Sequence, residues 1–241
     1  MIRVVEVEQE VRKKRVKLIA FFMAFSGILI IGATLYPIVS YEWMARYKYP
    51  LLVSPVSDND KADYYNKGVD YTRASNWFAR EANYQASKSP AVEFYTLSIP
   101  KLKIDSAIVA TNSDDLSQHL AQYPGTAEPG MVGNTVIFGH SVLPIFFNPK
   151  NYISIFSTLY KLDIGDEITV SYDGINYTYK VQDMFEVRPV DVQVLDQAAD
   201  TSYLELITCT PPGDPRKPKR LVVRAKIVPV QKESKNEILG Y

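Results

Sequence analysis

The chain contains one cysteine, Cys209, and two histidines, His119 and His140, and these residues limit the covalent chemistry that it can perform. A thiol reacts as the thiolate, which a nearby imidazolium or guanidinium stabilises. Cys209 ends the apolar run "YLELITC", and a proline-rich, basic loop separates it from Arg220. This set allows acyl transfer by a cysteine nucleophile, with a histidine moving protons and an arginine stabilising an oxyanion.

His140 is the stronger histidine candidate, because it directly follows the strand-like run "GNTVIFG". His119 lies in "LSQHLAQ", which we interpret as a short surface helix. If the strands that end at Cys209 and begin at Arg220 are neighbours, both residues lie at one end of a sheet. Arg224 lies further along that strand, where we expect a solvated face. On spacing alone, a packed and inert thiol remains the commoner case.

The segments that must position these residues have the residue pattern of a β-protein. Short alternating runs, separated by Gly, Pro and Asp turn signals, predict strands. The predicted strands cover residues 93–100, 103–110, 133–140, 166–172, 176–187, 203–209 and 220–228. The sequence "YDGIN" predicts a hairpin turn, and short helices are expected at 114–122, 155–161 and 193–199. The pattern is typical of a mainly β barrel or sandwich with short helices.

The N-terminus predicts a membrane anchor. Residues 18–41 carry no charge, and a spanning helix needs roughly 20 such residues. The basic residues just before this run are Arg12, Lys13, Lys14, Arg15 and Lys17. They place residues 1–17 in the cytoplasm and the rest outside the cell, in a single-pass topology at the cell membrane. We favour an uncleaved anchor over a signal peptide, because the apolar run is long and lacks a convincing cleavage site.

The remaining segments complete the expected organisation. Residues 42–92 are expected to form an extracytoplasmic stalk or N-terminal region, residues 93–230 the catalytic domain, and residues 231–241 a polar tail. Within the stalk, residues 71–87 predict a short helix that packs on the domain, and a lid role stays open. The chain has 27 basic and 27 acidic residues, which gives no global case for nucleic-acid binding. Asp114 and Asp115 fit caps or solvated charges better than a metal site, so we expect neither metal nor cofactor.

Several stretches resemble the sortase family. "LELITCTP" followed by "KRLVVRA" resembles the sortase cysteine strand and the arginine that opens the next strand. "PGMVGNTVIFGHS" resembles the segment that carries the sortase histidine. "LSIPKLKIDSAIV", "LYKLDIGDEITVSYDGINYTYKV" and "EVRPVDVQVL" also agree in order. The resemblance covers about residues 95–228.

The resemblance implies an eight-stranded sortase-like β-barrel and a cysteine transpeptidase. It assigns Cys209 as nucleophile, His140 as general acid and base, and Arg220 as the arginine that positions substrate and stabilises the oxyanion. It places Thr208, Ile207, Val190, Val194 and Pro211 along the substrate groove. The implied donors are secreted proteins with a C-terminal sorting signal. The implied acceptor is an amine on a cell-wall precursor or a pilin.

Some features depart from this family, and other functions stay open. The loop over residues 210–219 matches no single sortase class. "TCTP" is similar to the pilus-assembling class, yet residues 46–91 show no Asp-Pro-aromatic lid motif and the C-terminal residues are polar. An L,D-transpeptidase is disfavoured, because Leu206-Ile207-Thr208 stands where that class has a His-Gly pair. The alternatives are a hydrolytic cysteine peptidase of the same fold and a catalytically silent, membrane-anchored β-domain that binds partners.

Overall fold

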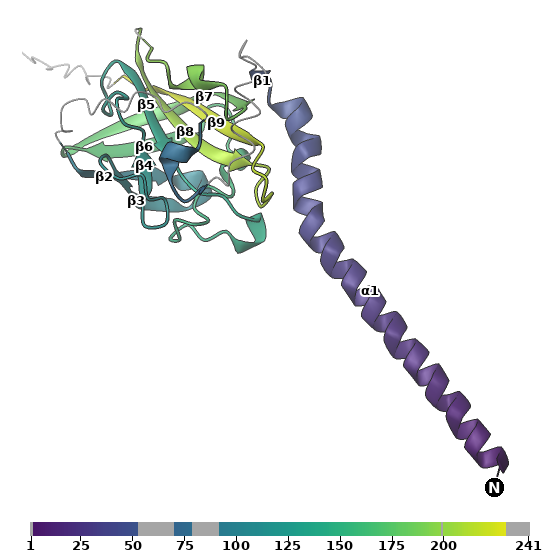
Figure 1. Ribbon diagram of the computed structural model, residues 1–241. Helices are drawn as coiled ribbons and strands as arrows, with labels where there is room; N and C mark the ends of the chain where they lie inside the picture. Colours follow the sequence, from purple (N-terminus) through teal and green to yellow (C-terminus); the bar gives the residue numbers. More distant parts are fainter. Residues whose placement is uncertain (1, 53–69, 79–91, 199, 230–241) are drawn as a thin grey trace, which may run out of the picture.

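The computed structural model describes residues 2–52, 70–78, 92–198 and 200–229. Its N-terminal element is the long helix α1 (Ile2–Lys48), which runs away from a β-barrel (Figure 1). In the described part of the chain, α1 alone is long and apolar enough to cross a membrane. Pro37 lies inside this helix. Proline offers no backbone N–H, so one hydrogen bond of the helix is missing there.

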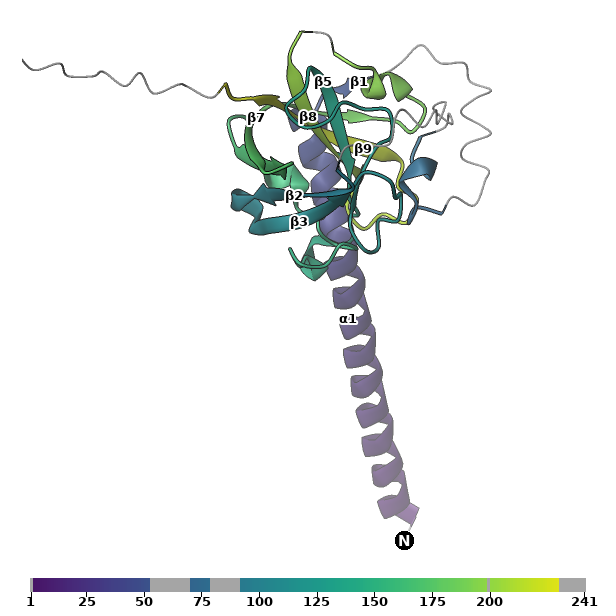
Figure 2. The same cartoon turned by 90° about the vertical axis from the view of Figure 1, so that its left-hand side faces the viewer.

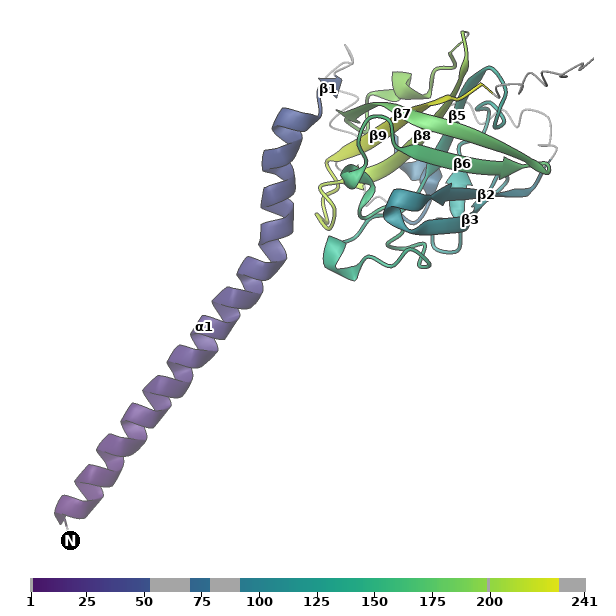
Figure 3. The same ribbon diagram turned by 180° about the vertical axis from the view of Figure 1, so that it is seen from behind.

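The barrel is a closed sheet of eight strands. They are β2 (Phe94–Ile99), β3 (Ile104–Ala110), β4 (Leu120–Gln122), β5 (Gly133–Phe138), β6 (Glu167–Tyr172), β7 (Ile175–Val187), β8 (Ser202–Thr210) and β9 (Lys219–Ile227). Their order is β7-β6-β2-β3-β4-β5-β8-β9, and β9 pairs with β7 to close the barrel (Figure 3). The short strand β1 (Leu51–Leu52) adds to β7 in parallel. The eight-stranded barrel behind an apolar helix confirms the predicted fold class.

The strand predictions are confirmed, whereas the helix predictions are confirmed only in part. The hairpin between β6 and β7 turns at Asp173 and Gly174, whose φ angles of 49° and 74° fit a type I′ turn. The helix expected at 114–122 is wrong, because this segment forms turns and then strand β4. The other helices are short 3-10 turns, namely η1 (Ala74–Asn76), η2 (Pro100–Leu102), η3 (Pro144–Phe146), η4 (Leu159–Lys161) and η5 (Val192–Leu195).

The expected stalk is only partly described. Residues 42–48 continue α1, and of the helix predicted over 71–87 the structure shows the short turn η1 within 70–78. Residues 53–69 and 79–91 lie outside the described residues. The last turns of α1 belong to the barrel core, since Tyr41 and Ala45 are buried against it, as is Tyr49 directly after the helix. Figure 2 shows this end of α1 passing behind the barrel.

Two apolar clusters lie on opposite faces of the strands that carry the candidate site. Alternate residues of β8, Leu204 and Leu206, fill the barrel interior with residues of β9 such as Leu221. The intervening residues Ile207 and Cys209 belong to a second cluster on the outer face. Because side chains alternate along a strand, the residue type at every second position sets this division. Cys209 therefore lies on the outside of the barrel wall, under whatever covers that face.

Candidate active site

Three adjacent strands bring the candidate residues together. In the antiparallel pair of β8 and β9, Cys209 lies directly opposite Arg220. In the parallel pair of β5 and β8, Phe138 lies opposite Ile207, which places His140 beside the end of β8. The three residues thus lie at one end of these strands, and β8 and β9 are the neighbours that the sequence analysis required for Cys209 and Arg220.

Hydrogen bonds hold the histidine segment against the cysteine strand. The backbone N–H of Gly139 donates to Ile207 O at 3.1 Å. The hydroxyl of Thr208 donates to Gly139 O at 2.8 Å, and that of Ser141 donates to Cys209 O at 2.6 Å. Gly139 has no room for a side chain, because a Cβ there would overlap the ring of Phe156. These contacts fix the backbone on both sides of His140 relative to Cys209.

The guanidinium of Arg220 is fully buried. Its Nη1 donates to Lys217 O at 2.8 Å and to Lys219 O at 3.1 Å. Its Nη2 donates to Trp77 O at 2.9 Å. The guanidinium carbon also lies 5.5 Å from the Trp77 ring centroid and 5.6 Å from that of Tyr71. Arg220 is therefore a preorganised set of donors beside the thiol, one of which bonds a carbonyl of residues 70–78.

His140 is neutral in this environment. Burial and, to a smaller extent, the positive charge of Lys217 lower the pKa of His140 to about 4, against the opposing effects of Asp115 and Asp70. Its ring lies 6.0 Å from the Trp77 ring, centroid to centroid. A neutral imidazole can accept a proton, but it cannot donate one to a leaving amine until it is protonated. More water at this site would move the pKa of His140 toward its usual range.

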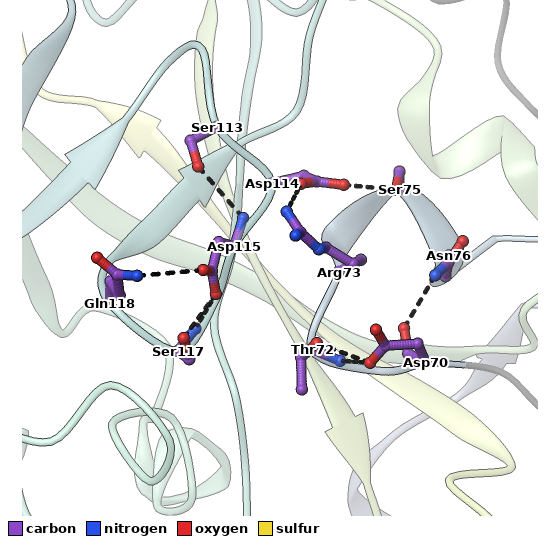
Figure 4. Close-up of polar contacts among 10 residues, drawn as sticks. All are labelled: Asp70, Thr72, Arg73, Ser75, Asn76, Ser113, Asp114, Asp115, Ser117 and Gln118. Atoms are coloured by element: carbon purple, nitrogen blue, oxygen red, sulfur yellow. Dashed lines mark hydrogen bonds and ion pairs between the residues drawn. The ribbon is translucent and has the colours of Figure 1, made fainter.

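Residues 70–78 cover the site, and we call them the cover segment. Trp77 and Phe78 pack in the same outer cluster as Cys209. The segment is fixed to the turn before β4, where Asp114 accepts hydrogen bonds from Arg73 Nη1 at 2.9 Å and Ser75 Oγ at 2.6 Å (Figure 4). With the cover in place, His140 is 6% exposed, Cys209 1% and Arg220 0%. A peptide substrate has no access to the thiol in this arrangement.

The predicted substrate-binding residues lie in different surroundings. Ile207 and Val194 belong to the same outer cluster as Cys209. Val190 is buried in the turn before η5, and Pro211 is buried directly after β8. Thr208 points to the opposite face of β8 from Cys209, where it bonds Gly139 O. Their contacts with substrate stay predictions, and those of Thr208 would be made through its backbone.

Arg224 is only partly solvated, whereas the sequence analysis expected a solvated face. Its Nη2 lies 2.6 Å from Glu205 Oε1, and its side chain is 33% exposed whereas that of Glu205 is 0%. Burial raises the pKa of Glu205 to about 7, against the lowering effect of Arg224. Glu205, Ile207 and Cys209 lie on the same face of β8, because side chains alternate along a strand. The Glu205–Arg224 pair therefore lies at the end of the apolar surface that Ile207 and Cys209 form.

The pair Asp114–Asp115 serves structure in the described chain. Asp114 holds the cover segment, and Asp115 accepts hydrogen bonds from the backbone and hydroxyl of Ser117 at 3.0 and 2.6 Å. Among the residues described here, no group of three or more His, Cys, Asp or Glu side chains is placed to bind a metal ion. The sequence analysis had missed the roles of Asp114 and Trp77. The aromatic run "YTRASNWF" was the signal that this segment packs on the domain.

Comparisons with known proteins agree with this geometry. The family model of the sortase domain matches residues 97–228. The crystal structure of sortase C-1 from Actinomyces oris is similar in fold, with a TM-score of 0.50 and 22% identity, over 82% of this chain and 98% of that one. A pilus-related sortase C of Group B Streptococcus gives a TM-score of 0.50 and 21% identity, over 73% of this chain and 93% of that one. No curated protein sequence matches.

Proposed function

The chain belongs to the sortase family, and from that premise we propose that it is a membrane-anchored cysteine transpeptidase. Its donors are secreted proteins with a C-terminal sorting signal, and its acceptor is an amine on a cell-wall precursor or a pilin. The observation that supports this proposal best is the strand register that sets Cys209 opposite Arg220. The pairing of β5 with β8 places His140 beside them. The apolar α1 supports anchoring at the cell membrane, with the barrel outside.

In the proposed reaction, the Cys209 thiolate attacks a backbone carbonyl carbon of the sorting signal. Arg220 stabilises the oxyanion through its N–H groups, as preorganised donors do. Protonated His140 gives its proton to the departing amine when the C–N bond breaks, and a thioester remains on Cys209. The acceptor amine then attacks the thioester and passes a proton to His140. The new amide forms, and the thiolate is released.

Access to the thiol requires the cover segment to move. The Arg220 donor that bonds Trp77 O is then available to the substrate carbonyl. Removal of Trp77 also lets water reach His140, which raises its pKa and allows the imidazolium to form. One displacement thus opens the site and prepares both His140 and Arg220.

The test is a transfer assay with the full chain, using fluorescent sorting-signal peptides and a set of amines, with products identified by mass spectrometry. We expect Cys209→Ala to abolish transfer, and His119→Ala, outside the site, to retain it. Undiminished transfer by the Cys209→Ala protein would refute the mechanism.

The same assay separates the alternatives. A hydrolytic peptidase would yield cleaved donor without amide product at any amine concentration. A silent β-domain would yield neither product, and Cys209 would react with a thiol reagent only at the rate of a buried side chain.

A further inference from the structure

The loop that follows His140 exposes two adjacent large apolar side chains. Ile145 is 74% exposed and Phe146 is 64% exposed, both within η3. Ile153, in the same loop, is 50% exposed. Ile145 and Phe146 are adjacent in the chain, and exposed apolar patches mark sites that contact other proteins or membranes.

The backbone of this loop is well ordered by its own hydrogen bonds. The N–H of Phe146 donates to Leu143 O at 2.9 Å, and that of Phe147 donates to Pro144 O at 3.1 Å. At the base of the loop, Asn148 N donates to Ser154 Oγ at 3.0 Å. The exposure of Ile145 and Phe146 is therefore imposed by a folded turn.

The position of the loop suggests what covers it. In Figures 1 to 3, the teal-green loop after β5 lies at the barrel edge that faces along α1 toward its N-terminus. The barrel is held to α1 by Tyr49, whose hydroxyl donates to Tyr160 O at 2.7 Å, and by Lys48, which pairs with Asp163 at 2.8 Å. The orientation of the barrel over the membrane is thus set by α1.

The outer end of α1 marks the level of the membrane surface. Trp43 is 71% exposed and Tyr47 is 84% exposed on the side of α1 away from the barrel. Tryptophan and tyrosine prefer the membrane–water interface. The apolar run of α1 ends at Tyr41, two residues before Trp43, so the interface lies near the end of the helix that packs against the barrel.

We propose that the loop over residues 142–153 is a second membrane contact, with Ile145 and Phe146 inserted in the lipid interface. The exposed Lys150 of this loop suits anionic headgroups. The proposal rests on the membrane anchoring proposed above. It assigns the barrel a fixed face toward the lipid and places His140, five positions before Ile145, close to the membrane surface.

Lipid contact can be measured with single fluorescent labels on the full chain. In a Cys209→Ala background, Ile145→Cys, Ile30→Cys in α1 and Ile175→Cys at the β6–β7 turn are each labelled with an environment-sensitive dye. Ile175 is 53% exposed, so it is a matched apolar control on another edge of the barrel. The proteins are reconstituted in vesicles of phosphatidylcholine and phosphatidylglycerol. Quenching by a nitroxide lipid is compared with quenching by aqueous iodide.

We expect the nitroxide lipid to quench the labels at 30 and 145 at least twofold more than the label at 175, and iodide to quench mainly the label at 175. A label at 145 that behaves like the label at 175 overturns the lipid contact. So does a label at 145 that neither quencher reaches, because a protein then covers the loop. A label at 30 outside the lipid refutes the anchor itself, which distinguishes the two failures.

Discussion

Arg220 is the residue whose surroundings say most about the reaction. It is fully buried, its Nη1 is committed to two carbonyls of its own loop, and its Nη2 bonds the carbonyl of Trp77. The first two bonds orient the planar group. The third is with the cover segment, which leaves the site in the proposed reaction. A lysine ammonium group could not bond the loop carbonyls and the carbonyl of Trp77 in this way, because it lacks the planar set of N–H donors of a guanidinium.

We therefore expect Arg220→Lys to lower kcat/KM for transfer by about a hundredfold or more, the usual cost of losing an oxyanion donor. Steady-state kinetics with a peptide donor and an amine measure this loss. Arg224→Lys is the matched control, because that side chain is one-third exposed and pairs with Glu205 rather than with the cover segment. Near-normal activity of Arg220→Lys would move the role to another cation.

His140 gives a pH prediction. Its pKa in the folded protein is about 4, against about 6.5 in an unfolded chain. Below pH 6.5 the unfolded state therefore binds a proton that the folded state excludes, so stability falls as pH drops from about 6.5 to 4, by about 3 kcal/mol in all. NMR titration should give a midpoint for His140 near 4, with His140→Gln assigning the signal. A midpoint near 6.5 for His140 with the cover segment in place would contradict the predicted lowering of its pKa.

At the scale of elements, backbone and side-chain hydrogen bonds hold the cover segment to the turn before β4. The backbone N–H of Ala74 donates to Asp114 O at 2.9 Å, and that of Leu116 donates to Thr72 O at 3.0 Å. Asp114 accepts one hydrogen bond from Arg73 and one from Ser75. Burial opposes ionisation of Asp114, but these two hydrogen bonds hold its pKa below the usual range. The carboxylate is thus charged at neutral pH, and its removal weakens the covered state without touching Cys209.

We expect Asp114→Ala to raise the rate of Cys209 alkylation about three- to tenfold, since each lost hydrogen bond is worth about 1 kcal/mol and this pair is partly solvated. The control is Asp115→Ala, which removes a neighbouring carboxylate that bonds Ser117 instead. Rates are measured with a small iodoacetamide reagent at constant pH. Equal rates in the two variants would show that Asp114 does not hold the cover.

The elements also show how far the sequence alone could lead. The alternation of apolar and polar residues, together with the turn residues, was sufficient to predict the long strands. The sequence "YDG" predicted the hairpin between β6 and β7. Strand β4 was missed because its three residues, Leu120–Gln122, are too short to show a period. The sequence predicted that the cover segment packs on the domain, but its position over the site depends on tertiary contacts of Trp77 with His140 and Arg220, which local sequence does not encode. The buried pair of Arg224 was missed because alternation gives the face of a strand but not what covers that face.

At the scale of the whole molecule, α1 and the barrel are one packed unit. Tyr49 is 4% exposed and its hydroxyl bonds Tyr160 O, whereas Tyr47, two residues earlier, is 84% exposed. The residue that directly follows α1 is therefore part of the barrel core, together with Tyr41 and Ala45 of the helix itself.

We expect Tyr49→Ala to lower the free energy of unfolding of the barrel by about 3 kcal/mol, as large-to-small changes of buried aromatics do. Tyr47→Ala is the matched control and should change it by less than about 0.5 kcal/mol. Denaturant unfolding of the full chain in nanodiscs, followed by Trp77 fluorescence in a Trp43→Phe background, measures both. Equal effects would show that the helix end does not support the barrel.

The contact between α1 and the barrel also bears on how the protein would respond to a pulling force. Glu186 accepts a hydrogen bond from Tyr41 of α1 at 2.9 Å and one from Thr210 at 3.1 Å, and it pairs with Lys219 at 3.0 Å. Thr210 and Lys219 directly follow Cys209 and directly precede Arg220. In the proposed acyl-enzyme, a pulling force on the polypeptide bound to Cys209 would therefore have a short path through Glu186 to Tyr41 of α1. Glu186 thus connects the helix directly to the residues next to Cys209 and Arg220, so this path bypasses the other strands of the barrel.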